Sequence, residues 1–154
     1  MIHSAGFICY KYDEELLIFL VHSTGHKGIW SFPKGEGEFP ETLLECALRE
    51  FKEETSIDID KFGLFKEEIC TDTFFNNPIY LGSIQQSKIK IVHAFAIEFN
   101  IDPKQCKSNW CEFPIGTGKI IPELDDYKWV RYDEALRIIN PKQIPLLLAL
   151  KVKI

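Results

Sequence analysis

Three glutamates in the first half of the chain have the type and spacing of a metal-binding cluster: Glu50, Glu53 and Glu54. They are related as i, i+3 and i+4, so on an α-helix their carboxylates share one face. Like charges at this spacing repel one another, and the C-terminal half of a helix disfavours anions. Mg²⁺, by contrast, prefers clustered oxygen ligands. The spacing therefore indicates a metal site, and the alternative is a solvated acidic face of the kind common on surface helices.

The helix that would present these glutamates extends from Pro40 or Glu41 to Thr55. Pro40 suits the first turn, because the N–H that proline lacks has no helical partner there. Four apolar residues at helical spacing predict one buried stripe: Leu44, Ala47, Leu48 and Phe51. Measured from Leu44, with about 100° per residue, the three glutamates lie between about 180° and about 280°. Their carboxylates therefore point away from the apolar stripe.

The residues around the cluster match the signature of a known family. Nudix proteins carry the pattern G-x5-E-x7-R-E-U-x-E-E-x-G-U, in which U is a bulky apolar residue. This chain has Gly35, Glu41 and the pair Arg49–Glu50 at those intervals, and the match continues through residues 51–57. Because every charged position agrees in register, the chain resembles the Nudix hydrolases.

Two positions depart from the signature. Phe51 is aromatic where an aliphatic residue is usual, and Ser56 replaces the final glycine. That glycine normally ends the helix in the left-handed conformation, which costs a non-glycine residue roughly 1 kcal/mol. Ser56 is not among the implied metal ligands, so we expect the change to affect the helix end and not the chemistry.

The resemblance covers nearly the whole chain. We call the signature, residues 35–57, the Nudix box. Residues 30–35 resemble the segment that leads into this box in many family members, and Glu123 with residues 129–135 resembles the family's closing strand and helix. The resemblance implies a single Nudix domain over residues 1–154, of the α/β class, with a mixed β-sheet sandwiched between α-helices. Residues 4–6, 80–86 and 92–96 are similar to a group of predicted nucleoside triphosphate pyrophosphohydrolases within the family.

The resemblance also implies an activity. A Mg²⁺-dependent Nudix hydrolase cleaves the pyrophosphate bond of a nucleoside diphosphate linked to another moiety, here a nucleoside triphosphate or a dinucleoside polyphosphate, with nucleotide sugars left open. Glu50, Glu53, Glu54 and the Gly35 carbonyl would hold Mg²⁺, or Mn²⁺ in its place. The implied catalytic set consists of these three glutamates and Arg49, which would pair with neighbouring carboxylates.

Residues outside the box must supply the remaining functions, and several alternatives stay open. The general base is Glu50 or an acidic residue of another segment: Glu123, Glu112 or Glu98. Five aromatic residues on or beside loops are candidates to stack on a nucleobase or to pack at the sheet edge: Phe74, Phe75, Tyr80, Trp110 and Phe113. The predicted substrate-binding set is Lys34, Glu123, Phe75 and Tyr80, with Lys34 contacting phosphate.

A second function class is a non-catalytic Nudix-fold module that senses a nucleotide without hydrolysing it. Such modules typically lose one or more box carboxylates, whereas this chain retains them all. The sequence therefore favours the enzyme.

Composition restricts the partners. The net charge is −5 with a pI near 5.4, and no basic stripe appears, which disfavours binding to a nucleic acid polymer. The five cysteines are scattered without zinc-ligand spacing and are expected to be reduced. The sequence shows no signal-peptide pattern and no apolar run of membrane-spanning length. We therefore expect a cytoplasmic protein that binds no membrane, as a monomer or homodimer.

The strands expected around the helix indicate a mixed sheet, because strands and helices interleave irregularly. Strands are predicted as a hairpin at residues 5–10 and 16–21, and singly at 57–65, 89–99 and 127–131. Between them, residues 34–37 are predicted as a flexible connector, 70–86 as a turn-rich segment and 101–120 as a loop.

The C-terminal part is predicted to be helical. Asp133 is expected to cap a helix over residues 134–139, and Pro141 to open a last helix that ends near Lys151. The apolar residues 144–150 are expected to pack on the same chain or on a partner.

Overall fold

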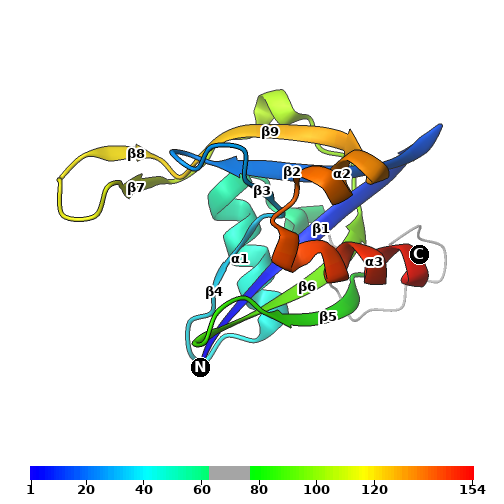
Figure 1. Ribbon diagram of the computed structural model, residues 1–154, viewed down its shortest axis with the longest axis horizontal. Coiled ribbons are helices and arrows are strands. Elements are labelled where there is room, and N and C mark those ends of the chain that lie inside the picture. Colours follow the sequence, from blue (N-terminus) through cyan, green and yellow to red (C-terminus); the bar gives the residue numbers. More distant parts are fainter. Residues whose placement is uncertain (63–76) are drawn as a thin grey trace.

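A mixed β-sheet with helices on both faces forms the body of the protein (Figure 1). The computed structural model describes residues 1–62 and 77–154. The strands are β1 (Ile2–Asp13), β2 (Glu15–Ser23), β3 (Trp30–Ser31), β4 (Lys34–Glu36), β5 (Ile79–Gln85), β6 (Lys90–Glu98), β7 (Trp110–Glu112), β8 (Ile120–Pro122) and β9 (Leu124–Arg131). The helices are α1 (Leu43–Thr55), α2 (Tyr132–Ile138) and α3 (Ile144–Lys153), with 3₁₀ turns at Ile59–Phe62, Pro103–Gln105 and Pro141–Gln143.

Strand β1 runs through the centre of the sheet. It forms an antiparallel hairpin with β2, turning at Glu14, and it pairs in parallel with β6 along its length. The order across the sheet is β3-β2-β1-β6-β5, with β4 beside β1 and β9 beside β2. The strands predicted at residues 5–10, 16–21, 89–99 and 127–131 are therefore confirmed, and each boundary lies within three residues of the predicted one.

Alternating side chains of the strands supply two cores, one on each face of the sheet. Phe7 of β1 points toward α1 and meets Phe51 edge-on, with ring centroids 6.2 Å apart. Ile8 points to the opposite face, into the core that contains Ala135 of α2 and Leu147 of α3. Helix α1 covers one face and the C-terminal helices cover the other, which confirms the predicted sandwich.

Three segments differ from the sequence prediction. Residues 34–36, predicted as a flexible connector, form β4 and pair with residues 4–6 of β1. A 3₁₀ turn lies at Ile59–Phe62 where the sequence predicts a strand, and residues 63–65 of that prediction lie outside the described part of the chain. Strand β5 lies within the segment predicted as turns. Strand β4 depends on β1, a partner far along the chain that local propensity does not register, whereas β5 pairs with β6, the next strand in sequence.

Residues 101–120, predicted as one loop, contain most of a projecting hairpin. Strands β7 and β8 pair with each other and extend away from the main sheet in Figure 1; we call residues 110–122 the arm. The arm touches the loop after β2, where the rings of His26 and Phe113 lie 5.8 Å apart. Trp110 and Ile120 of the arm are exposed.

The C-terminal helices begin differently from the prediction. Helix α2 follows Arg131 without a side-chain cap, and Asp133 pairs with Arg131 at 3.1 Å instead of capping the helix. Pro141 opens a 3₁₀ turn, after which α3 begins. Three leucines of α3 are buried against the same chain: Leu146, Leu147 and Leu150. Among the described helices, none has the length and apolar character needed to cross a membrane.

Candidate active site

Helix α1 carries the three glutamates, and it starts later than predicted. The Thr42 hydroxyl accepts a hydrogen bond from the Glu45 N–H at 3.1 Å, and the Glu45 carboxylate accepts one from the Thr42 N–H at 3.2 Å. This capping box satisfies N–H groups that have no partner within the helix. Pro40 lies in the preceding loop after a cis peptide bond, so the prediction that it opens the helix is wrong.

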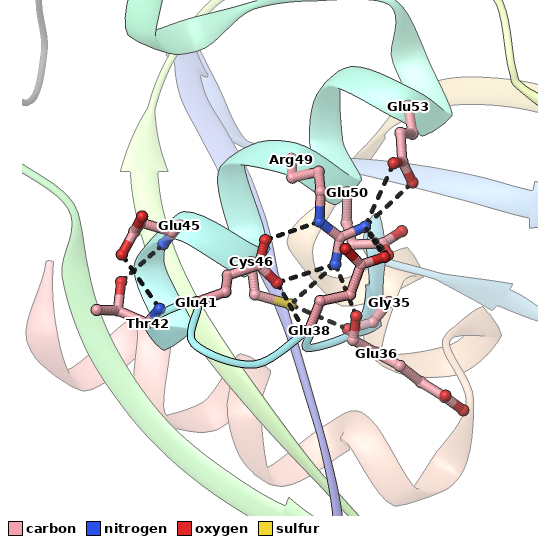
Figure 2. A network of polar contacts seen from close by, with 10 residues as sticks. All are labelled: Gly35, Glu36, Glu38, Glu41, Thr42, Glu45, Cys46, Arg49, Glu50 and Glu53. Carbon is pink, nitrogen blue, oxygen red and sulfur yellow. Dashed lines mark hydrogen bonds and ion pairs between the residues drawn. The ribbon is translucent and has the colours of Figure 1, made fainter.

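Arg49 lies at the centre of the network in Figure 2. Its Nε and Nη2 donate to the two carboxylate oxygens of Glu41 at 2.8 and 3.0 Å, and Nη2 also donates to the Glu36 carbonyl at 2.7 Å. Its Nη1 donates to Glu50 at 2.8 Å and lies 3.3 Å from both carboxylate oxygens of Glu53. One guanidinium therefore ties the loop before the helix to two of the three cluster glutamates.

Gly35 leaves room for the Glu50 carboxylate. Gly35 lies in β4 opposite Ala5, and a Cβ atom placed on it would be 2.0 Å from the Glu50 carboxyl carbon. Any side chain at this position would therefore displace that carboxylate. The Gly35 carbonyl accepts a hydrogen bond from the buried Cys46 thiol at 3.3 Å, which holds β4 against the helix.

Glu54 is the most buried of the three glutamates. It is 4% exposed, and its carboxylate accepts a hydrogen bond from the main-chain N–H of Lys34 at 2.9 Å. Burial, followed by the negative charges of Glu123 and Glu50, raises the pKa of Glu54 well above the ordinary value. The pKa of Glu50 is also raised, first by burial. Burial therefore disfavours the ionised form of both carboxyl groups, and the neighbouring negative charges add to this effect.

The three glutamates differ in exposure, from the buried Glu54 beside β4 to the exposed Glu53. The Glu53 side chain is 42% exposed and that of Glu50 is 12% exposed. Within residues 1–62 and 77–154, no three His, Cys, Asp or Glu side chains converge as a finished ion site. Instead, the Arg49 guanidinium contacts both Glu50 and Glu53. The carboxylates that could bind a metal ion are therefore gathered on one helix, and two of them are paired with this arginine.

Comparison with known proteins decides the family. A model of the NUDIX domain matches residues 2–150. The chain belongs to the Nudix family. The match confirms the resemblance carried by the box, and with it the predicted enzyme class, a Nudix-type pyrophosphohydrolase.

Solved structures share the Nudix fold of this chain. The C. elegans Ap4A hydrolase in a binary complex has a TM-score of 0.63 at 17% identity, over 99% of this chain and 96% of that one. The NUDIX domain of Shewanella oneidensis NrtR, complexed with ADP ribose, has a TM-score of 0.64 at 14% identity, over 99% and 88%. The MutT protein of Methanosarcina mazei Go1 has a TM-score of 0.57 at 18% identity, over 99% and 94%. At these identities the similarity shows the fold alone.

The end of the Nudix helix keeps the expected backbone despite the change of residue. Ser56 is left-handed, with φ 66° and ψ 12°, and its N–H donates to the Lys52 carbonyl. The Ser56 hydroxyl donates to the Lys107 carbonyl at 2.6 Å, a bond that glycine cannot make. Nearby, the Tyr127 hydroxyl of β9 donates to the Glu54 carbonyl at 2.7 Å. Tyr127 is not among the predicted site residues, because no spacing within one element links it to the helix.

Two residues predicted outside the Nudix box lie with the cluster. Glu123, between β8 and β9, is close enough for its charge to raise the pKa values of Glu54 and Glu50. Lys34 of β4 lies beside Glu54, and burial lowers the pKa of its ammonium group. These residues are brought together from three separate segments.

Other predicted residues lie elsewhere. The Tyr80 hydroxyl is 2.8 Å from His93 Nδ1, and His93 Nε2 is 2.9 Å from His3 Nδ1, so Tyr80 belongs to a cluster across β5, β6 and β1. Glu112 lies on the arm, where it accepts a hydrogen bond from the Gly116 N–H, and Glu98 ends β6 opposite Tyr10. Phe75, together with Phe74, lies outside the described residues.

Proposed function

We propose that this Nudix protein is a Mg²⁺-dependent hydrolase that cleaves the pyrophosphate bond of a nucleoside diphosphate linked to another moiety. The observation that supports this most directly is the buried carboxyl cluster on α1. Glu54 and Glu50 have raised pKa values, and Glu123 adds a third negative charge beside them. A divalent cation is the fitting counter-charge for carboxylates gathered on one face of a helix.

The residues present suit such an ion. The proposed ligands are the carboxylates of Glu50, Glu53 and Glu54 and the Gly35 carbonyl, all of them the oxygen donors that Mg²⁺ prefers and Mn²⁺ accepts. The missing Cβ at Gly35 gives the Glu50 carboxylate its place against β4. Arg49 would keep its hydrogen bonds to Glu41 and to the Glu36 carbonyl. Its Nη1 contacts with Glu50 and Glu53 would be replaced by contacts of these two carboxylates with the ion.

The proposed reaction is attack of water on one phosphorus of the diphosphate. A bound divalent ion supplies neutralisation of the phosphate charge and a lowered pKa for the attacking water. One P–O bond forms to the water oxygen, and the P–O bond to the bridging oxygen breaks, so that oxygen leaves with the second phosphate. Glu123 accepts the proton of the water, and Lys34 offers its ammonium group to a phosphate oxygen. Arg49 and Glu41 hold the loop in place during the step.

The substrate class is supported by two proteins with the same fold. Their names refer to Ap4A and to ADP ribose, which directs the search toward nucleotides with linked phosphates. We therefore propose nucleoside triphosphates and dinucleoside polyphosphates as the first candidates, with ADP ribose and nucleotide sugars beside them.

A Mg²⁺-dependent hydrolysis screen of these compounds tests the proposal. Glu53→Gln should lower kcat at least about 100-fold on any active compound, because it removes a charged ligand and leaves the fold intact. Glu45→Gln is the matched control on the same helix, since glutamine also completes a capping box. Full activity of Glu53→Gln would refute the proposed site. Tight nucleotide binding without phosphate release by the wild type would instead favour the nucleotide-sensing module.

A further inference from the structure

The last turn of α1 carries two of the proposed ligands, Glu53 and Glu54, and each of its carbonyl groups accepts a hydrogen bond from another part of the protein or from the helix cap. The final four carbonyls of a helix have no partner within the helix. Here each accepts a hydrogen bond: Lys52 from the Ser56 N–H (2.8 Å), Glu53 from the Asn109 N–H (2.9 Å), Glu54 from the Tyr127 hydroxyl (2.7 Å) and Thr55 from the Lys107 N–H (3.1 Å). Three of the four donors come from residues 107–127.

Tyr127 is the side chain among these donors, and its position is well defined. Its ring is half-buried and stacks on Phe19 of β2, with centroids 6.3 Å apart and planes at 18°. A tyrosine hydroxyl carries its proton at neutral pH, so this group is a donor to the Glu54 carbonyl at 2.7 Å. The hydroxyl is therefore a fixed donor held by the sheet.

Glu54 is consequently held from two sides. Its carboxylate accepts a hydrogen bond from the Lys34 N–H of β4 at 2.9 Å, and its carbonyl accepts the Tyr127 hydroxyl of β9. A helix end without such partners frays, and fraying would move Glu54 and the adjacent Glu53 together. Metal ligands must be held within about 0.5 Å of their working positions.

We propose that Tyr127 is a positioning residue for the divalent ion: by holding the Glu54 carbonyl, it fixes the turn that presents Glu53 and Glu54. This inference rests on the proposed function, because it assumes that these glutamates are the ligands. It assigns Tyr127 no contact with the ion or the substrate.

The chain supplies a matched control. Tyr132 is also half-buried, and its hydroxyl donates to the Leu147 carbonyl of α3 at 2.9 Å, on the opposite face of the sheet. Tyr127→Phe and Tyr132→Phe each remove one hydroxyl that donates to one helix carbonyl. Both variants keep the ring, so both should fold. They differ in whether the helix carries the glutamate cluster.

The decisive measurement is Mn²⁺ affinity, from titration of metal-free protein followed by electron paramagnetic resonance. We expect Tyr127→Phe to bind Mn²⁺ about tenfold more weakly than wild type, and Tyr132→Phe to bind it unchanged. Thermal unfolding without metal should show similar losses for both variants. In the hydrolysis assay, Tyr127→Phe should lower kcat with little change in KM. Equal Mn²⁺ affinity for the two variants would overturn the inference.

Glu53→Gln separates this inference from the proposed function. If Glu53→Gln loses Mn²⁺ binding and activity while Tyr127→Phe keeps both, the ligand assignment stands and the positioning role is wrong. If Glu53→Gln itself binds Mn²⁺ and hydrolyses substrate like the wild type, the proposed function fails first.

Discussion

The two ends of helix α1 are held by different kinds of interaction. At the N-terminal end, the capping box of Thr42 and Glu45 and the pairing of Arg49 with Glu41 connect residues within one short stretch of chain. At the C-terminal end, Ser56 and Glu54 bind Lys107 and Tyr127, which are 51 and 73 residues away in sequence. The first network is local, and the second exists only when the sheet has formed.

This difference separates two tasks in the proposed site. The local network sets the loop from Gly35 to Glu41 against the helix and holds Glu50 through Arg49. The distant network holds the last turn of α1, which carries Glu53 and Glu54, in position against β4 and β9. Changes at the N-terminal end should therefore disturb the loop and Glu50, whereas changes at the C-terminal end should disturb the last turn.

Among changes that leave the proposed ligands in place, the largest effect should come from breaking the local network at its centre. Arg49→Ala removes the shared partner of Glu41, Glu50 and Glu53 and leaves three carboxylates without their counter-charge. We expect kcat/KM to fall about 10- to 100-fold in the Mg²⁺ assay, the range typical for partners of metal ligands. Arg131→Ala is the control, because Arg131 pairs with Asp133 and Glu15 on the exposed surface. Equal activity of the two variants would show that the Arg49 network is not needed.

The same contrast explains which parts of the site can be predicted from the sequence. Glu50, Glu53, Glu54 and Arg49 lie on one helix, so their intervals alone place them together. The apolar patterns predict the central hairpin and the long strand β6, and family resemblance predicts the sandwich, all confirmed by the structure. Spacing within one element and a known signature are therefore sufficient for these features.

The parts that cannot be predicted depend on contacts between elements. Strand β4 has the sequence Lys-Gly-Glu, with no strand propensity, and it forms because β1 offers an edge beside residues 4–6. Tyr80 is an aromatic residue near a turn-rich segment, yet its hydroxyl binds His93 across the sheet. The start of the helix is the exception: the pair Thr42 and Glu45 is a local signal that marks it correctly, whereas Pro40 does not.

The second prediction concerns the C-terminal turn and pH. The folded-state pKa of Glu54 is raised, so above its unfolded pKa the folded chain retains a proton that the unfolded chain has lost. The free energy of unfolding of metal-free protein should then fall as pH rises from about 4.5 through the raised pKa. Mg²⁺ favours the carboxylate and should reverse the trend, adding about 2.7 kcal/mol at 100 times its Kd.

Thermal unfolding in a chelator and in Mg²⁺, followed from about pH 5 to about pH 8, measures this slope. Glu54→Gln should flatten the metal-free slope, because its side chain does not titrate, while Glu45→Gln on the exposed side of the helix should leave it unchanged. A metal-free melting temperature that rises with pH in the wild type, and equally in Glu54→Gln, would contradict the assignment of a raised pKa to Glu54.

The smallest effects should come from the two caps, and they compare the ends directly. Thr42→Ala removes the capping box and should lower the free energy of unfolding by about 1 kcal/mol. Ser56→Ala should cost a similar amount, about 1 kcal/mol, because it loses the bond to the Lys107 carbonyl and keeps the left-handed backbone. Ser56→Gly loses the same bond but relieves roughly 1 kcal/mol of backbone strain, so it should lie near the wild type.

Denaturant unfolding of the three variants and of the double variant Thr42→Ala with Ser56→Ala tests the comparison. The two caps are separated by the length of α1, about 20 Å at about 1.5 Å per residue, so their losses should add. The relative stabilities of the wild type, Ser56→Gly and Ser56→Ala are the more sensitive test of how the C-terminal end is held. If Ser56→Ala and Ser56→Gly were both as stable as the wild type, neither the strain nor the distant bond would act at this end. The C-terminal turn would then be held by the donors from residues 107–127 alone, and the share contributed by Tyr127 would be larger.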